Sequence, residues 1–384
     1  MGLIYMDYNA TTPVRPAVLE ALLPFYRQQF GNPSSIHWAG RQVRGAVEEA
    51  RERVAALAGC EPVEVVFTSC GTEADNMAIM GVASARRGEG NHIITSRVEH
   101  PAVLNTCLAL EQQGYEITRL EVDRYGLPDL GELEAAITGR TILISLMFAN
   151  NETGTIFPVR AIAALAAEHR ICFHCDAIQA LGKVPIDVKG MGMALTSLSG
   201  HKIGAPKGVG ALVVRTGTKL HPLLYGGPQE RNRRGGTENV AGIVAFGKAC
   251  ELAGSALTGE ARRLAALRDR LERGIGERIP HTRVNGHPTE RLPNTLNISS
   301  RGVAADSLLL NLDLEGIAVS SGSACSSGTL KASHVLAAMN LDPVYASGSV
   351  RFSLGAESTE DDVDKVLAVL PPIVERMRNP EYDR

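Results

Sequence analysis

Lys202 lies in a short segment, residues 199–210, in which a serine, a histidine and several glycines surround it. Apolar runs at 194–198 and 211–215 predict a buried strand on each side, so the lysine is expected on a connection between two core strands. Such connections commonly carry functional groups. A lysine amine can form a Schiff base with an aldehyde cofactor. Taken alone, the segment also fits a surface lysine in a turn.

Other polar residues follow predicted strands at 92–96, 141–148 and 171–175: His100, Asn151, Asp176 and Gln179. Predicted strands and helices alternate along this part of the chain, which favours a mostly parallel sheet with helices on both faces. The carboxyl ends of the strands in such a sheet converge on one crevice. The sequence therefore predicts a single site that joins these residues to Lys202.

Two segments have the composition of anion sites. A strand at 65–68, a turn of small residues at 69–73 and a helix from residue 74 would direct free N–H groups and the hydroxyl of Thr72 at a ligand. The alternative is an ordinary helix cap. The arginine- and glycine-rich stretch 231–239 precedes a predicted helix at 240–253, and either holds a phosphate or forms a solvated loop.

Cys325 stands in a run of small residues, 320–329. No apolar periodicity anchors this run, so we expect an exposed and mobile loop whose thiol is accessible as a nucleophile. The alternative is an idle cysteine.

Two further residues have side chains suited to binding. Arg351 lies within the apolar run 350–354, where it either binds an anion such as a carboxylate or lies on the solvated face of an edge strand. Asn32 precedes a proline, so its backbone is expected to be extended, either across the mouth of the site or in a plain turn.

Composition limits the classes of protein. With 44% hydrophobic and 21% charged residues, the 384-residue chain has the composition of a soluble globular protein of about two domains. A net charge of −3 gives no case for nucleic acid or an anionic membrane, and we find no signal peptide or long apolar run. Seven scattered cysteines fit a reducing cytoplasm. Cys172 and Cys175 lie in a predicted strand whose alternation sends their sulfurs to opposite faces, which disfavours a shared metal.

Many short motifs occur in order along almost the whole chain: FGNPSS, FTSCGTEADN, VEHPAV, ANNETGT, HCDAIQALGK, LSGHKIGAPKGVG, RRGGTENV, SSGSACSSG and VRFSLG. In these the chain resembles the cysteine desulfurases, which are pyridoxal-phosphate enzymes of fold type I. The wording is most similar to the nitrogen-fixation type, NifS, and next to the housekeeping type, IscS. The resemblance implies a large cofactor-binding α/β domain at 15–256, and a smaller α+β domain, formed by 1–14 and 257–384, that carries the catalytic cysteine loop.

The resemblance also implies roles for single residues. Lys202 is expected to hold pyridoxal 5'-phosphate and to move protons at the substrate Cα. Asp176 is expected to pair with the ring nitrogen, Gln179 to bond the ring hydroxyl, and His100 to stack on the ring and assist proton transfer. The phosphate is assigned to Gly71, Thr72, Ser199 and His201, with Thr237 from the partner subunit of a homodimer. The carboxylate of L-cysteine is assigned to Asn151, Arg351 and Asn32.

The implied reaction converts L-cysteine into L-alanine and leaves the sulfur as a persulfide on Cys325. An iron–sulfur scaffold protein, NifU- or IscU-like, is the expected acceptor, and Cys325 is also a predicted transient iron–sulfur ligand shared with it. Nitrogenase maturation is the expected role. The alternatives are a housekeeping sulfur donor, a selenocysteine lyase or other pyridoxal enzyme, and a non-catalytic assembly protein. Residues 330–333, Leu-Lys-Ala-Ser, depart from the acidic residue and proline usual in relatives, which leaves loop stiffness and acceptor docking open.

Overall fold

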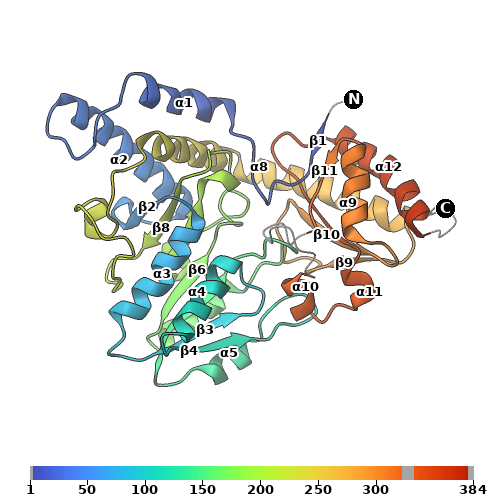
Figure 1. Cartoon of the computed structure of the whole chain (residues 1–384), viewed down its shortest axis with the longest axis horizontal. Helices are drawn as coiled ribbons and strands as arrows, with labels where there is room; N and C mark the ends of the chain where they lie inside the picture. Colours follow the sequence, from blue (N-terminus) through green and yellow to red (C-terminus); the bar gives the residue numbers. More distant parts are fainter. Residues whose placement is uncertain (1–2, 322–332, 379–384) are drawn as a thin grey trace.

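The computed structural model describes residues 3–321 and 333–378. Its largest element is a seven-stranded sheet with the strand order β2-β8-β7-β6-β5-β3-β4 (Figure 1). The strands are β2 (Val65–Thr68), β3 (His92–Ser96), β4 (Glu116–Leu120), β5 (Thr141–Met147), β6 (Cys172–Asp176), β7 (Leu195–Ser199) and β8 (Gly210–Val214). β8 is antiparallel to β2 and β7, and all other neighbouring pairs in this sheet are parallel. The predicted mostly parallel sheet is confirmed.

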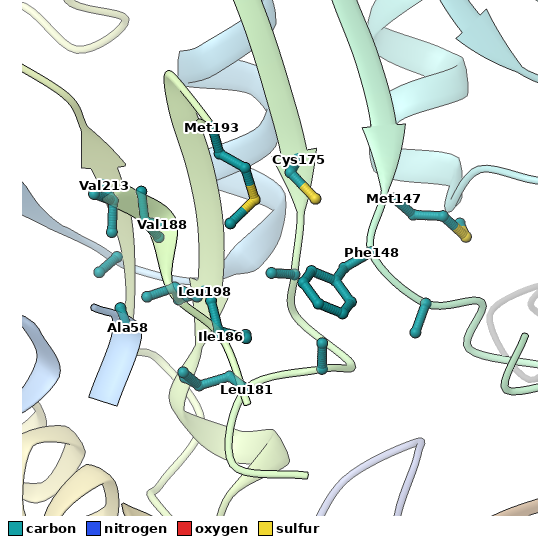
Figure 2. Close-up of a cluster of buried hydrophobic side chains, with 14 of the residues drawn as sticks. Ala58, Met147, Phe148, Cys175, Leu181, Ile186, Val188, Met193, Leu198 and Val213 are labelled. Carbon is teal, nitrogen blue, oxygen red and sulfur yellow. The ribbon is translucent and has the colours of Figure 1, made fainter. Parts of the chain in front are cut away.

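Alternating side chains place the two faces of this sheet in two separate cores. Val66 and Leu212 belong to the core beneath α3 and α4, whereas their neighbours Phe67 and Val213 belong to a larger core beneath α2, α6 and the first part of α8. Figure 2 shows part of the larger core, where Val213 lies near Leu198 and Val188. The helices are α2 (Trp38–Ala58), α3 (Gly71–Ala85), α4 (Pro101–Glu111), α6 (Val159–Glu168) and α8 (Val240–Arg278).

Several further helices and turns complete this part of the chain. They are α1 (Pro16–Arg27), α5 (Leu130–Ala136), α7 (Val188–Met191) and the 3-10 turns η1 (Pro62–Glu64), η2 (Gly200–Lys202) and η3 (Glu230–Asn232). The turn η2 directly follows β7, so Lys202 lies on the connection from β7 to β8, as its flanking apolar runs predict.

A second core surrounds a smaller antiparallel sheet with the order β12-β10-β9. Leu271, Phe352 and Val366 are buried in it. The elements here are β9 (Thr282–Asn285), β10 (Thr295–Ser300), β12 (Ser349–Ser353), the parallel pair β1 (Ile4–Tyr5) and β11 (Ile317–Ala318), and the helices α9 (Ala305–Leu314), α10 (His334–Ala338), α11 (Pro343–Ala346) and α12 (Glu360–Arg378). Figure 1 shows this region beside the large sheet, with α8 running from one to the other.

The helix α8 is one continuous helix of 39 residues, whereas the helix predicted from the sequence at this place ends at residue 253. Gly254 and Gly259 within it each weaken a helix by about 1 kcal/mol relative to alanine. Burial of Cys250 in the first core and Leu264 in the second offsets this cost. The proposed domain boundary at residue 256 falls inside α8 and stays a prediction. Among the described residues, α8 alone has the length and composition of a membrane span, but more than half of its apolar window is buried.

The N-terminal segment 6–15 connects the small sheet to the Lys202 turn. At one end, the N–H of Asn9 donates to Ser353 Oγ at 2.9 Å. At the other end, the N–H groups of Thr12 and Arg15 donate to the carbonyls of His201 and Gly204, both at 3.0 Å. The segment therefore passes directly beside Lys202 and joins it to β12.

Candidate active site

A cavity of about 390 Å³ lies at the carboxyl ends of β3, β5, β6 and β7. It contains ten of the thirteen residues that the sequence singled out: Gly71, Thr72, His100, Asn151, Asp176, Gln179, Ser199, His201, Lys202 and Arg351. This is the crevice expected of an open, mostly parallel sheet. Cys325 lies outside the described residues, and Asn32 and Thr237 do not line the cavity.

Lys202 is held by the N-terminal segment. Its Nζ donates to the carbonyl oxygens of Asn9 at 2.6 Å and Ala10 at 2.8 Å. Just after it, Gly204 has a φ of +92°, which favours glycine, and a Cβ there would lie 2.6 Å from Arg15 Cγ. This glycine lets the chain turn back into β8 while Lys202 points into the cavity.

Asp176 ends β6 with its carboxyl group buried in the cavity. Its Oδ1 accepts a hydrogen bond from the N–H of Ile178 at 3.0 Å. Burial raises the pKa of this carboxyl to about 6, and the Ile178 N–H and the Lys202 ammonium act to lower it. A second positive group beside Asp176, such as a protonated ring nitrogen, would stabilise the carboxylate further.

Gln179 is also buried, one helical turn beyond the end of β6. Its Nε2 donates to the Asn9 carbonyl at 3.0 Å, and its Oε1 accepts from Lys183 Nζ at 2.8 Å. The amide hydrogens of Gln179 and the amine of Lys202 therefore meet at one oxygen atom.

The start of α3 and the end of β7 form an anion cradle. The hydroxyl of Ser199 is buried and has no hydrogen-bond partner among the described residues. A Cβ at Gly71 would lie 2.2 Å from Ile178 Cδ1, so a larger residue there would displace the Ile178 side chain. Free N–H groups at the start of a long helix, an unsatisfied buried hydroxyl and the nearby His201 suit a phosphate. Together with the amine of Lys202, these residues fit a phosphorylated aldehyde cofactor.

The arginines of the 231–239 stretch are engaged elsewhere. Arg234 Nε donates to Glu73 Oε1 at 2.9 Å, and Arg231 pairs with Glu48 at 3.4 Å. These ion pairs with carboxylates of the same chain give the arginines a structural role and weaken the phosphate alternative. Thr237 lines a separate cavity of about 80 Å³ together with Arg234. Within one subunit, Thr237 is thus apart from the Lys202 cavity, and its role stays a prediction.

His100 caps the start of α4. Its Nδ1 accepts from the N–H of Ala102 at 3.1 Å, so the neutral ring carries its proton on Nε2. Burial, with Lys202 adding to it, lowers the pKa of His100 to about 4. The imidazole is therefore neutral near pH 7.

Arg351 lies on β12, at the edge of the small sheet, but its side chain is only 2% exposed. The prediction of a buried arginine is confirmed, and the solvated alternative is wrong. Its Nη1 donates to the Asn151 carbonyl at 2.9 Å and its Nη2 to Asp7 Oδ1 at 2.6 Å. Nε has no partner among the described residues, which leaves a donor for a carboxylate.

Asn32 lies in an exposed turn, where its Oδ1 accepts from the N–H of Ser34 at 2.9 Å. Its expected contact with the substrate stays a prediction. Cys175 and Cys172 contact the cores on opposite faces of the large sheet, as their alternation predicts. Within residues 3–321 and 333–378, no group of three or more histidine, cysteine or acidic side chains could hold a metal ion.

Sequence reasoning missed Asn9 and Lys183 as members of the site. Asn9 precedes the first helix, and Lys183 follows Gln179 by four residues, a spacing that also suits any surface lysine. The spacing of four residues from Gln179 could have indicated Lys183, because residues four apart in a helical turn are neighbours.

Comparison with known proteins identifies the family. The family model "Aminotransferase class-V" matches residues 4–366. "Cysteine desulfurase 2" of Trichormus variabilis is 53% identical over 378 residues, which are 98% of this chain and 94% of that protein. "Cysteine desulfurase IscS" of Methanosarcina thermophila is 53% identical over 376 residues, 98% of this chain and 93% of that protein. A solved NifS-like protein superposes with a TM-score of 0.92 at 37% identity, covering 97% of this chain and 100% of its own.

These relatives span nearly the full length of the chain, and the match includes both sheets and the segment that carries Lys202. The cavity itself offers an amine, a buried carboxylate and an anion cradle, the groups that a pyridoxal-phosphate enzyme requires. The chain therefore belongs to the class-V aminotransferase family and has the fold of a fold-type-I pyridoxal-phosphate enzyme.

Proposed function

We propose that this protein is a pyridoxal-phosphate-dependent cysteine desulfurase, which converts L-cysteine into L-alanine and leaves the sulfur as a persulfide on Cys325. The observation that carries the proposal is the meeting of Lys202, Asp176, His100 and Arg351 in one cavity. The two relatives described above, both named cysteine desulfurases, support the choice of substrate.

In this proposal the chain's own groups have separate tasks. The start of α3 and the Ser199 hydroxyl hold the cofactor phosphate, and Asp176 holds the ring nitrogen. When bound, the cofactor withdraws electrons from the substrate Cα. Lys202 moves the proton at that carbon, and the neutral His100, which lines the same cavity, assists. Arg351 binds the substrate carboxylate through its Nε, which has no hydrogen-bond partner in the described part of the chain.

The sulfur step needs a nucleophile from outside the described residues. The Cys325 thiolate attacks the substrate sulfur, and the bond between Cβ and sulfur breaks. The electron pair of that bond stays with the substrate carbon, which takes up a proton and leaves as L-alanine. Cys325 retains the sulfur as a persulfide for an acceptor. No external oxidant is required, because the substrate sulfur is transferred as a formally neutral atom.

The proposal also includes the oligomeric state, the sulfur acceptor and the cellular role. The active form is a homodimer, and Thr237 of each subunit reaches the phosphate in the other subunit's cavity. The acceptor is an iron–sulfur scaffold protein, NifU- or IscU-like, with Cys325 as a transient shared ligand. The enzyme acts in the cytoplasm, with nitrogenase maturation as its expected role and housekeeping cluster assembly as the alternative. The position of Thr237 supports the homodimer, since in its own subunit this residue lines a different cavity.

Paired assays of alanine and sulfide test the function. The wild-type enzyme, given L-cysteine and a thiol reductant, should form the two products in equal amounts. Cys325→Ala should retain the yellow cofactor but form neither product. A Cys325→Ala variant with full activity would overturn the persulfide step and favour a selenocysteine lyase or another pyridoxal reaction. A wild-type protein that binds no cofactor would overturn the enzyme proposal as a whole.

A further inference from the structure

Lys183 is a half-buried lysine that the proposed reaction does not use. It follows Gln179 by one helical turn, in which the N–H of Leu181 donates to Ala177 and that of Val184 to Ala180. Its Nζ donates to Gln179 Oε1 at 2.8 Å and to Asn9 Oδ1 at 3.0 Å. The amine of Lys183 thus binds the side-chain amides of both Gln179 and Asn9.

The amide of Gln179 has two ends of nearly equal shape, an oxygen that accepts and a nitrogen that donates. A lysine ammonium has donors but no acceptor, so it fixes Oε1 on its own side. Nε2 must then point away, and it donates to the Asn9 carbonyl at 3.0 Å, the oxygen that also accepts from Lys202 Nζ at 2.6 Å. The donating end of Gln179 is therefore the end nearest Lys202.

We propose that Lys183 is a positioning residue of the active site: it locks the amide of Gln179 so that Nε2 is presented to the ring oxygen of the cofactor bound to Lys202. This inference rests on the proposed function. A hydrogen-bond donor at the ring oxygen stabilises the negative charge on that oxygen. This charge is largest when the Lys202 nitrogen that is bonded to the cofactor has lost its proton. Lys183 thereby keeps the pKa of that nitrogen low.

The surroundings of Lys183 are mainly cationic on the cavity side. Burial lowers the pKa of Lys183 well below its usual value, and the charges of Lys202 and Arg351 lower it further. A neutral amine at Lys183 would keep N–H donors for both hydrogen bonds, but only the ammonium lacks an acceptor and so excludes the reversed amide of Gln179. The titratable and charged groups around it are Lys202, Arg351 and His201. Four more, Tyr8, Arg15, Glu260 and Glu357, line a small cavity of about 80 Å³ together with Lys183 and Lys202.

The experiment is a pH titration of the cofactor absorbance in the full-length holoenzyme. Lys183→Met should raise the pKa of the Lys202 nitrogen by about one pH unit. Lys189→Met is the control, because that lysine is 66% exposed and pairs with Glu61 on the surface at 3.5 Å. Its titration should match the wild type. The cofactor dissociation constant of each apoprotein gives a second readout, expected to rise for Lys183→Met alone.

A double-mutant comparison separates positioning from a direct effect of charge. Gln179→Leu should raise the same pKa by itself, and Lys183→Met added to it should produce no further shift. If Lys183→Met shifts the pKa equally with and without Gln179→Leu, the proposal is overturned. An unchanged pKa in the Lys183→Met single variant would overturn it as well. If Lys183→Met does not fold, Lys183→Gln takes its place. It should raise the pKa as well, since a neutral amide can meet Gln179 with either end. Failure of the proposed function is distinguishable, because the wild type would then lack the cofactor absorbance.

Discussion

A single buried histidine, His174, connects neighbouring strands of the large sheet. His174 lies on β6 two residues before Asp176, and its ring nitrogens contact Ser145 Oγ on β5 and Ser197 Oγ on β7, both at 2.9 Å. It therefore links three neighbouring strands beneath the cavity. Burial lowers the pKa of His174 to about 3, and it raises that of Asp75, which lies 3.6 Å from the ring. His174 is therefore neutral near pH 7, so its contact with Asp75 is not an ion pair.

This lowered pKa predicts a measurable uptake of protons on unfolding. Between about pH 4 and pH 6, His174 stays neutral in the folded protein, but it gains a proton in the unfolded chain, where the ordinary pKa is about 6.5. Its contribution therefore makes the folded protein less stable as the pH falls through this window. Unfolding of the apoprotein at pH 5 in weak buffer should take up about one proton more for the wild type than for His174→Gln. Equal uptake would show that His174 is already charged in the fold.

At the scale of elements, α8 and the N-terminal segment set the relative position of the two halves of the cavity. Lys202 and Asp176 belong to the large sheet, whereas Arg351 comes from β12 in the small one. The helix α8 packs its first part in one core and its last part in the other. The guanidinium of Arg351 and the amine of Lys202 therefore keep their separation only while these two connections stay rigid.

Ser255→Pro tests the contribution of α8. Proline at this exposed site removes a helix hydrogen bond and clashes with the preceding turn, at a cost of about 3 kcal/mol. The cofactor should still bind, because its residues come from the large sheet. The KM for L-cysteine should rise about tenfold or more, because Arg351 is displaced. Ser255→Ala is the matched control and should leave KM and the melting temperature near the wild-type values. An unchanged KM in Ser255→Pro would mean that the N-terminal segment alone positions Arg351.

Some of these elements could be predicted from sequence and others could not. The strands of the large sheet are short apolar runs between turn residues, so the sheet and the residues at its carboxyl ends were recognisable. The continuity of α8 was not recognisable, because glycines such as Gly254 are typical of helix ends. Packing against the two cores keeps α8 helical through this glycine. Asn9 also escaped prediction, because its place beside Lys202 depends on contacts with residues hundreds of positions away, such as Ser353.

On the scale of the whole molecule, one subunit contains most of a site. The cavity of the described chain includes the amine, the buried carboxylate and the guanidinium, yet Thr237 lies in another cavity and Asn32 in an exposed turn. Large apolar side chains near these places are exposed to solvent: Phe30, Ile36, Trp38 and Tyr225. Exposed apolar groups of this size are typical of surfaces that another protein covers. In the proposed homodimer, a second copy of the chain would bury them and supply Thr237.

Mixed dimers test whether Thr237 acts across the subunits. Lys202→Ala subunits cannot form the bond to the cofactor, and Thr237→Ala subunits should bind it about tenfold more weakly, the equivalent of 1.4 kcal/mol. When the two variants are co-expressed with different affinity tags and the mixed dimer is isolated, one cavity combines Lys202 with an intact Thr237 from its partner. That dimer should bind one cofactor with wild-type affinity. If Thr237 acts within its own subunit, the only cavity with Lys202 still lacks it, and the affinity of the mixed dimer should equal that of Thr237→Ala.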